Sequence, residues 1–177
     1  MNIYDCKFYD NSAKPRYGVH ESVGFGGAIG NFGTLEIRKC EFHDNSAELD
    51  GGAIDHLDGF MSVEDSIFKN NKSHINGGAI CSISDSTVSN SVFEENSARI
   101  SDDGNEGSCI YIRDCEVTCT DSIFKESYSN SIVNWGNIIL KNPEFSDNKA
   151  SPISNYGKMK LHDSTFIKND GILSNFN

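Results

Sequence analysis

A two-part motif recurs along the whole chain and restricts the fold more than any other feature of the sequence. Its first half is Phe-x-x-Asn, preceded two positions earlier by Cys or Ser in most copies. The phenylalanines are Phe8, Phe42, Phe68, Phe93, Phe124, Phe145 and Phe166, and six of them are followed by Asn11, Asn45, Asn71, Asn96, Asn148 and Asn169. Ser127 takes the asparagine position after Phe124. The shortest spacing between phenylalanines, 21 residues, therefore defines the minimal repeat.

The second half of the motif is Gly-Gly-Ala-Ile, at residues 26–29, 51–54 and 77–80, with a degenerate copy at 107–110. Later copies keep only the sequence Ile-x-Asn-aromatic-Gly, at 132–136 and 153–157. That tail also follows the first strict copy, at 29–33. The strict and degenerate copies therefore share one register.

Short alternating stretches such as residues 34–38 predict β-strands separated by turns. One repeat cannot bury its apolar face, whereas stacked repeats align every Phe and Ile in continuous internal rows. We therefore expect an all-β, single-stranded parallel β-helix of about seven coils over one domain, residues 1–177. The asparagine amides should link neighbouring coils at turns where a left-handed backbone is tolerated. The paired glycines should form a sharp corner.

Composition excludes several classes of function. The net charge of −11 opposes binding to phosphate backbones, and no basic patch offsets it, so no nucleic-acid partner is expected. Apolar runs reach about three residues, as at 138–140, so no transmembrane segment is predicted.

The alternation of Gly-Gly-Ala-Ile with Phe-x-x-Asn resembles the repeat of chlamydial-type polymorphic outer membrane proteins. That resemblance implies a right-handed, pectin-lyase-like β-helix that is adhesin-like and displayed at the cell surface or extracellularly. The start shows no signal peptide and residues 173–177 end inside a motif. We expect a truncated chain or a segment of a longer one, with a cytoplasmic location as an alternative. Uncapped coils would allow end-to-end self-association.

The six cysteines occupy slots of the repeat, which favours packed, reduced thiols over a disulfide framework. Cys6 and Cys40 share the position two before Phe on neighbouring coils and form the one candidate disulfide. Cys115 and Cys119 lack a second ligand pair at zinc spacing, so no metal site is expected.

Acidic residues recur two positions after the phenylalanines, in a column that is either solvated or able to attract a cation. The members are Asp10, Asp44, Asn70, Glu95, Glu126, Asp147 and Lys168. One position earlier, Lys69, Glu94 and Lys125 should form alternating ion pairs.

The longest connections between the two halves of the motif, residues 12–25 and 97–106, should leave from the same corner of the stack. Because binding residues often lie on loops of a rigid scaffold, we expect the contact surface there. The candidate residues are Arg16, Tyr17, His20, Arg99, Asp102, Asp103 and Glu106. No cofactor is predicted, although the oxygen-rich segment 102–106 could bind Ca²⁺ without matching an EF-hand.

These features favour a non-catalytic surface module whose partner is a cell-surface protein or a glycan. The alternative is a polysaccharide lyase or glycoside hydrolase that acts on acidic glycans, because this fold class hosts such enzymes. Arg38 and Arg113 could serve a lyase as base. However, the acidic residues occupy slots shared by several copies, as expected of a scaffold, so we predict no catalytic residues.

Overall fold

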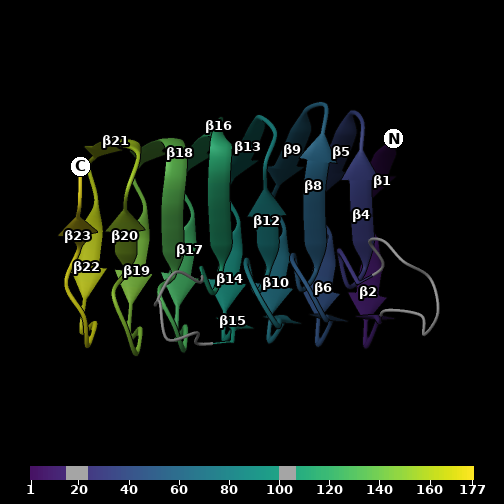
Figure 1. Ribbon diagram of the computed structural model, residues 1–177, viewed down its shortest axis with the longest axis horizontal. Helices are drawn as coiled ribbons and strands as arrows, with labels where there is room; N and C mark the ends of the chain where they lie inside the picture. The colour runs from purple at the N-terminus through teal and green to yellow at the C-terminus, as the bar shows by residue number, and fades with distance from the viewer. Residues whose placement is uncertain (15–23, 100–106) are drawn as a thin grey trace.

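The computed structural model describes residues 1–14, 24–99 and 107–177, and every regular element in these ranges is a β-strand. All strand pairs are parallel, and the strands form a solenoid whose ends lie at opposite ends of its long axis (Figure 1). The described residues complete about five turns. The sequence predicts about seven coils, and the second sheet contains seven stacked strands.

Three sheets run along the solenoid. The first contains β1 (Asn2–Tyr4), β4 (Ile29–Phe32), β5 (Leu35–Arg38), β8 (Ile54–Asp58), β9 (Met61–Glu64), β12 (Ile80–Ser82), β13 (Ser86–Ser89), β16 (Ile110–Thr120), β18 (Ile132–Lys141), β20 (Ile153–Asn155), β21 (Lys158–His162) and β23 (Ser174–Asn175). The second contains β2 (Lys7–Tyr9), β6 (Glu41–His43), β10 (Ile67–Lys69), β14 (Val92–Glu94), β17 (Ile123–Lys125), β19 (Glu144–Ser146) and β22 (Thr165–Ile167). The third contains β3 (Ser12–Ala13), β7 (Ser46–Ala47), β11 (Lys72–Ser73) and β15 (Ser97–Ala98).

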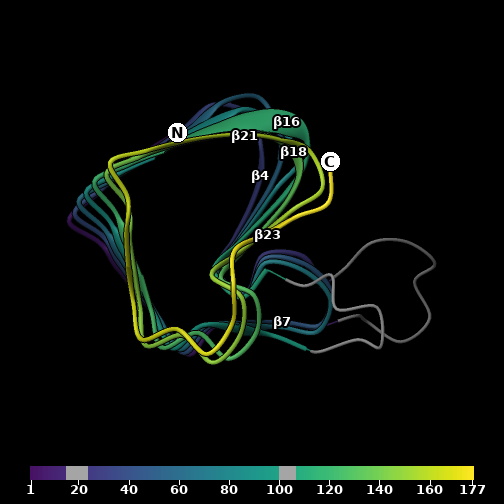
Figure 2. The same cartoon turned by 90° about the vertical axis from the view of Figure 1, so that its left-hand side faces the viewer.

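The view along the stack shows the coils superimposed, with β7 on the opposite side of the coil from β21 (Figure 2). In the first sheet, β16 pairs with both β12 and β13, so this long strand joins two rows of shorter strands. Its register against β18 shifts between Arg113 and Glu116, where the path bends.

The second sheet stacks seven strands, with the phenylalanines paired in the register that the repeat predicts. Neighbouring ring centroids are 4.7 to 5.1 Å apart, with nearly parallel planes. The central rings, from Phe42 to Phe145, are fully buried. Together with Leu35, Ile54 and Ile110 they fill the interior of the solenoid.

The asparagines form a ladder beside these rings. The Nδ2 group of Asn71 donates to the carbonyl oxygen of Phe42 at 2.9 Å and to Oδ1 of Asn96 at 3.0 Å. Its own Oδ1 accepts from the backbone N–H and the side chain of Asn45. Asn71 therefore satisfies its hydrogen-bonding groups by linking three coils.

The expectation of a left-handed backbone at these asparagines is wrong, because the left-handed residue lies one position earlier. Residues two after each phenylalanine, the largely acidic column, have φ between 50 and 55°. A second such column lies three before each phenylalanine, with φ between 48 and 52°, at Asp5, Lys39, Asp65, Asn90, Asp121, Asn142 and Asp163. Asp and Asn tolerate this conformation better than most residues, so both columns have a local structural role at two corners of every coil.

The two glycines of each Gly-Gly-Ala-Ile copy have different roles. Gly51 has φ +65°, a conformation that side-chain-bearing residues rarely adopt. Gly52 faces the next coil, and a Cβ there would lie 1.9 Å from the carbonyl oxygen of Gly78. The first glycine therefore makes the corner, and the second allows neighbouring backbones to approach closely.

All six cysteines are free, and five of them are buried. The candidate Cys6–Cys40 disulfide is not formed, because the Cys40 sulfur accepts the backbone N–H of Cys6 at 3.4 Å and donates to the carbonyl oxygen of Arg38 at 3.2 Å. Serine hydroxyls make the same two contacts at Ser66 and Ser91. The thiols thus substitute for hydroxyls in a ladder that crosses the coils.

Candidate functional site

Most of the residues expected at the contact surface lie outside the described ranges. Those are Arg16, Tyr17, His20, Asp102, Asp103 and Glu106, and the candidate Ca²⁺ segment 102–106 lies there with them. Arg99 is described: it directly follows β15 and is exposed.

The third sheet forms one wall of a groove with a cavity volume of about 490 Å³. Its lining residues are Ser12, Lys14, Ser46, Ala47, Glu48, Lys72, Ser73, His74, Ser97, Ala98 and Arg99. Lys14 directly precedes segment 15–23, and Arg99 directly precedes segment 100–106. The described residues that lead into the two longest connections therefore line one groove.

A row of four side chains, two of them cationic, crosses four coils along this groove. Backbone hydrogen bonds set the register: Glu48 N donates to Ala13 O, His74 N to Ala47 O, and Arg99 N to Ser73 O, at 3.0 to 3.1 Å. Each donor directly follows its strand, as does Lys14, so Lys14, Glu48, His74 and Arg99 occupy equivalent positions. Nδ1 of His74 lies 3.1 Å from Oε2 of Glu48.

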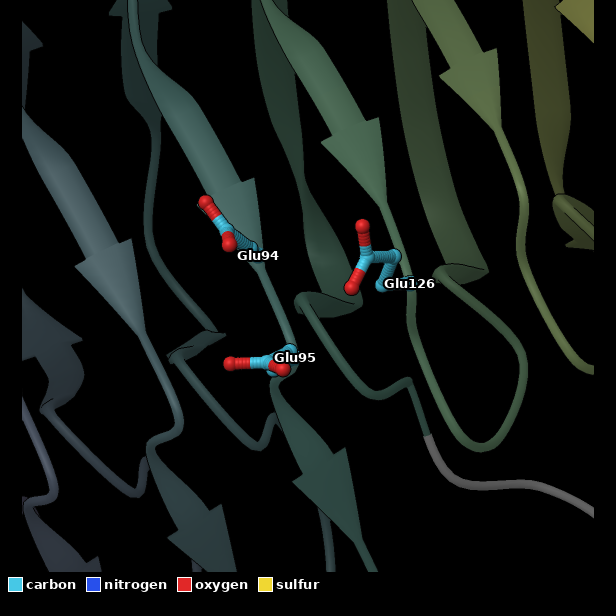
Figure 3. Close-up of side chains that lie close together, drawn as sticks. All are labelled: Glu94, Glu95 and Glu126. Atoms are coloured by element: carbon cyan, nitrogen blue, oxygen red, sulfur yellow. The ribbon is translucent and has the colours of Figure 1, made fainter.

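A group of three acidic residues lies on the neighbouring second sheet. Carboxylate oxygens of Glu94, Glu95 and Glu126 all lie within 4.8 Å of one another (Figure 3). Nζ of Lys69 is 2.7 Å and Nζ of Lys125 is 3.0 Å from Glu94, which confirms the expected alternating ion pairs. The hydrogen bond from Lys69 lowers the pKa of Glu94, and the pair with Lys125 adds to this effect. Glu94 is therefore compensated by two lysines, and Glu95 also faces Lys69 at 3.4 Å.

One carboxylate departs from this pattern of exposed, paired charge. Asp55, on β8, is 1% exposed, and the Cys81 side chain is the neighbouring group that favours its ionised form most, although neither carboxylate oxygen makes a geometrically regular hydrogen bond in the described structure. Cys81 pairs with it in register on β12, and Tyr111 pairs with Cys81 on β16. Burial, with repulsion from Asp50, raises the pKa of Asp55 to about 7. Sequence reasoning missed this residue because it occurs in one coil only.

A second feature that the sequence did not predict is an aromatic stack on the outside. The rings of Trp135, Tyr156 and Phe176 stack with centroids 4.1 and 4.5 Å apart, and Trp135 and Phe176 remain 41% and 61% exposed. The Asn-aromatic-Gly motif contained the signal, since its aromatic residue recurs at one register position. The adjacent Asn134, Asn155 and Asn175 form a second amide ladder, with successive Nδ2–Oδ1 distances of 2.6 Å.

The arginines considered for a lyase are engaged at the surface. Nε of Arg38 lies 2.8 Å from Glu36 and 3.2 Å from Glu64, and Nε of Arg113 lies 3.9 Å from Asp114. Among the described residues, no helix has the length and apolar character needed to cross a bilayer.

Comparison with protein-family models gives a short match. Residues 65–83 match the sequence model of the Chlamydia polymorphic membrane protein repeat. This segment contains Phe68, Asn71 and the Gly-Gly-Ala-Ile copy at 77–80, which together form one complete two-part motif. No curated protein and no solved structure matches the chain. Residues 65–83 are therefore similar to the Chlamydia polymorphic membrane protein repeat, and they lie within a parallel β-solenoid.

Proposed function

We propose that the chain is a non-catalytic, adhesin-like module that acts at the cell surface or outside the cell and contacts a cell-surface protein or a glycan. The repeat match at residues 65–83 supports the surface assignment. The same proposal includes a right-handed, pectin-lyase-like coil. It also includes end-to-end association through the outermost coils, where Phe166 is 41% exposed while Phe68 is fully buried.

One observation carries the non-catalytic assignment: the acidic side chains that recur in register serve the fold. Acidic residues recur at the two left-handed corners of the coils, and Glu94 sits between two lysines. A glycoside hydrolase needs two carboxylates that flank an accessible sugar bond. The groove contains one carboxylate among its described lining residues, Glu48.

A glycan-degrading enzyme is the second candidate, and Asp55 is the observation that favours it. A buried carboxyl whose pKa is raised to about 7 has the property of a general acid. Its side chain is 1% exposed, so a glycosidic oxygen cannot reach it in this structure. Release of unsaturated or reducing sugars from polygalacturonate by the purified chain would support the enzyme over the adhesin-like module.

Protease treatment of intact source cells tests the surface assignment. We expect a protease added outside the cells to release peptides of this chain, identified by mass spectrometry, while a cytoplasmic marker protein stays intact. Full protection of the chain until the cells are lysed would contradict a surface location.

A further inference from the structure

The groove over the third sheet has a charge opposite to that of the chain as a whole. Lys14, Lys72 and Arg99 line it with one carboxylate, Glu48, which gives three positive charges against one negative with His74 neutral. The chain has a net charge of −11. Because salt screens exposed charges beyond about 10 Å at 0.1 M ionic strength, an anion inside the groove interacts mainly with these nearby cations.

Between the cations, the described wall of the groove is small and rich in hydroxyl groups. Ser12, Ser46 and Ser97 follow one register row together with Lys72, and Ser46 Oγ donates to Ser12 Oγ at 3.1 Å. The described lining contains no Phe, Tyr or Trp and no aliphatic side chain larger than alanine. Such a wall can bond sugar hydroxyls, but it has no large apolar surface to enclose an apolar peptide side chain.

The geometry requires an extended ligand. Lys14 and Arg99 occupy the first and fourth positions of a row whose neighbouring strands lie about 4.8 Å apart, so they are about 14 Å apart along the stack. A small anion can contact one end of this row, whereas a linear polyanion can contact both.

We infer that this groove binds a linear acidic glycan along the axis of the solenoid. Its carboxylate or sulfate groups pair with Lys14, Lys72 and Arg99, and its hydroxyl groups bond the serine row. The inference rests on the proposed function, because it names the ligand class of the surface module. An acidic peptide is the competing ligand, and the hydroxyl-rich wall favours the glycan.

Binding by exposed charges implies a strong dependence on salt. Each exposed ion pair contributes little, and it is weakened as ionic strength rises. Affinity should therefore depend on several contacts made at once along the glycan.

The test measures fluorescence anisotropy of labelled oligosaccharides mixed with the full chain. The probes are a short heparin-derived oligosaccharide, an oligogalacturonate and, as the neutral control, a dextran oligosaccharide of similar length. We expect both acidic probes to bind at low ionic strength and to dissociate at about 1 M salt, where screening acts beyond about 3 Å. The dextran probe should not bind.

Two double variants separate the groove from net charge. Lys72→Gln with Arg99→Gln should weaken binding about tenfold, since two exposed pairs are lost. Lys158→Gln with Lys160→Gln removes the same charge from β21, outside the groove, and should leave affinity within about twofold. Circular dichroism checks that both variants remain folded.

Three results would overturn the inference: absence of binding to both acidic oligosaccharides, equal loss of affinity in the two double variants, or tighter binding of poly-glutamate than of either glycan. None of these affects the protease test on intact cells. Failure of the glycan site can therefore be distinguished from failure of the surface assignment.

Discussion

At the scale of single residues, the break in the asparagine ladder is compensated by a second substitution. Ser127 is shorter than the asparagine of the other copies, and Cys109 replaces the smaller alanine found at Ala53 and Ala79. Cys109 Sγ lies 3.0 Å from Ser127 Oγ, and both residues are fully buried. Burial raises the pKa of Cys109 to about 12, so the thiol is protonated at neutral pH. The larger side chain of Cys109 therefore fills the space left by the shorter side chain of Ser127.

This compensation predicts strong coupling in a double-mutant cycle. Ser127→Asn alone should overpack the core and lower the free energy of unfolding by about 1–3 kcal/mol. Cys109→Ala alone should cost about 1 kcal/mol through the space it leaves. The double variant restores the pair found in other coils and should be more stable than the sum predicts. Urea denaturation measures all four proteins, and additive effects would show that the sites are independent.

At the scale of the repeated element, the paired glycines determine how closely the coils stack. Gly52 lies where a Cβ would contact the backbone of the next coil, and Gly33 has open space around the same position. The two glycines therefore separate a packing requirement from the general effect of replacing glycine.

Gly52→Ala should lower the free energy of unfolding by about 3 kcal/mol, the upper end of typical overpacking costs, because rigid backbone atoms must move apart. Gly33→Ala should stay within about 0.5 kcal/mol of the wild type, as surface changes usually do. Chemical denaturation of both variants provides the comparison. A similar loss in the two would indicate that the close approach at Gly52 can relax.

Prediction from the sequence succeeded at this scale where a residue type recurred and failed where it did not. Seven phenylalanines in register were sufficient to predict the stacked sheet, because stacking alone buries them all. The left-handed position was placed one residue late, since Asn and Asp both tolerate that backbone and spacing cannot separate neighbours. Asp55 occurs once, so no periodicity indicated its burial. The basic groove was missed because its charges come from four coils.

At the scale of the whole molecule, one buried carboxyl affects global stability. Burial and, to a smaller extent, repulsion from Asp50 raise the pKa of Asp55 from 3.8 to about 7, and Cys81 and Arg113 oppose this shift in part. Protonated Asp55 therefore favours the folded state. Its stabilising contribution is fully present below pH 4 and is lost as pH rises towards 7, because the unfolded state releases the proton first.

Asp55→Asn should remove this pH dependence. Relative to the variant, the wild type should lose on the order of 4 kcal/mol of unfolding free energy between about pH 4 and pH 7, at 1.36 kcal/mol per pKa unit. Above pH 7 the difference should stay constant, since Asp55 is then ionised in both the folded and the unfolded state.

Asp58→Asn is the matched control, because Asp58 lies on the same strand, is exposed, and accepts a hydrogen bond that an amide oxygen can also accept. Urea titrations across this pH range measure the three proteins. Parallel curves for wild type and Asp55→Asn would mean that the Asp55 carboxyl is solvated in the folded protein. If the free energy of unfolding stays constant between about pH 4 and pH 7 only in Asp55→Asn, this carboxyl is the group that makes the solenoid less stable at neutral pH.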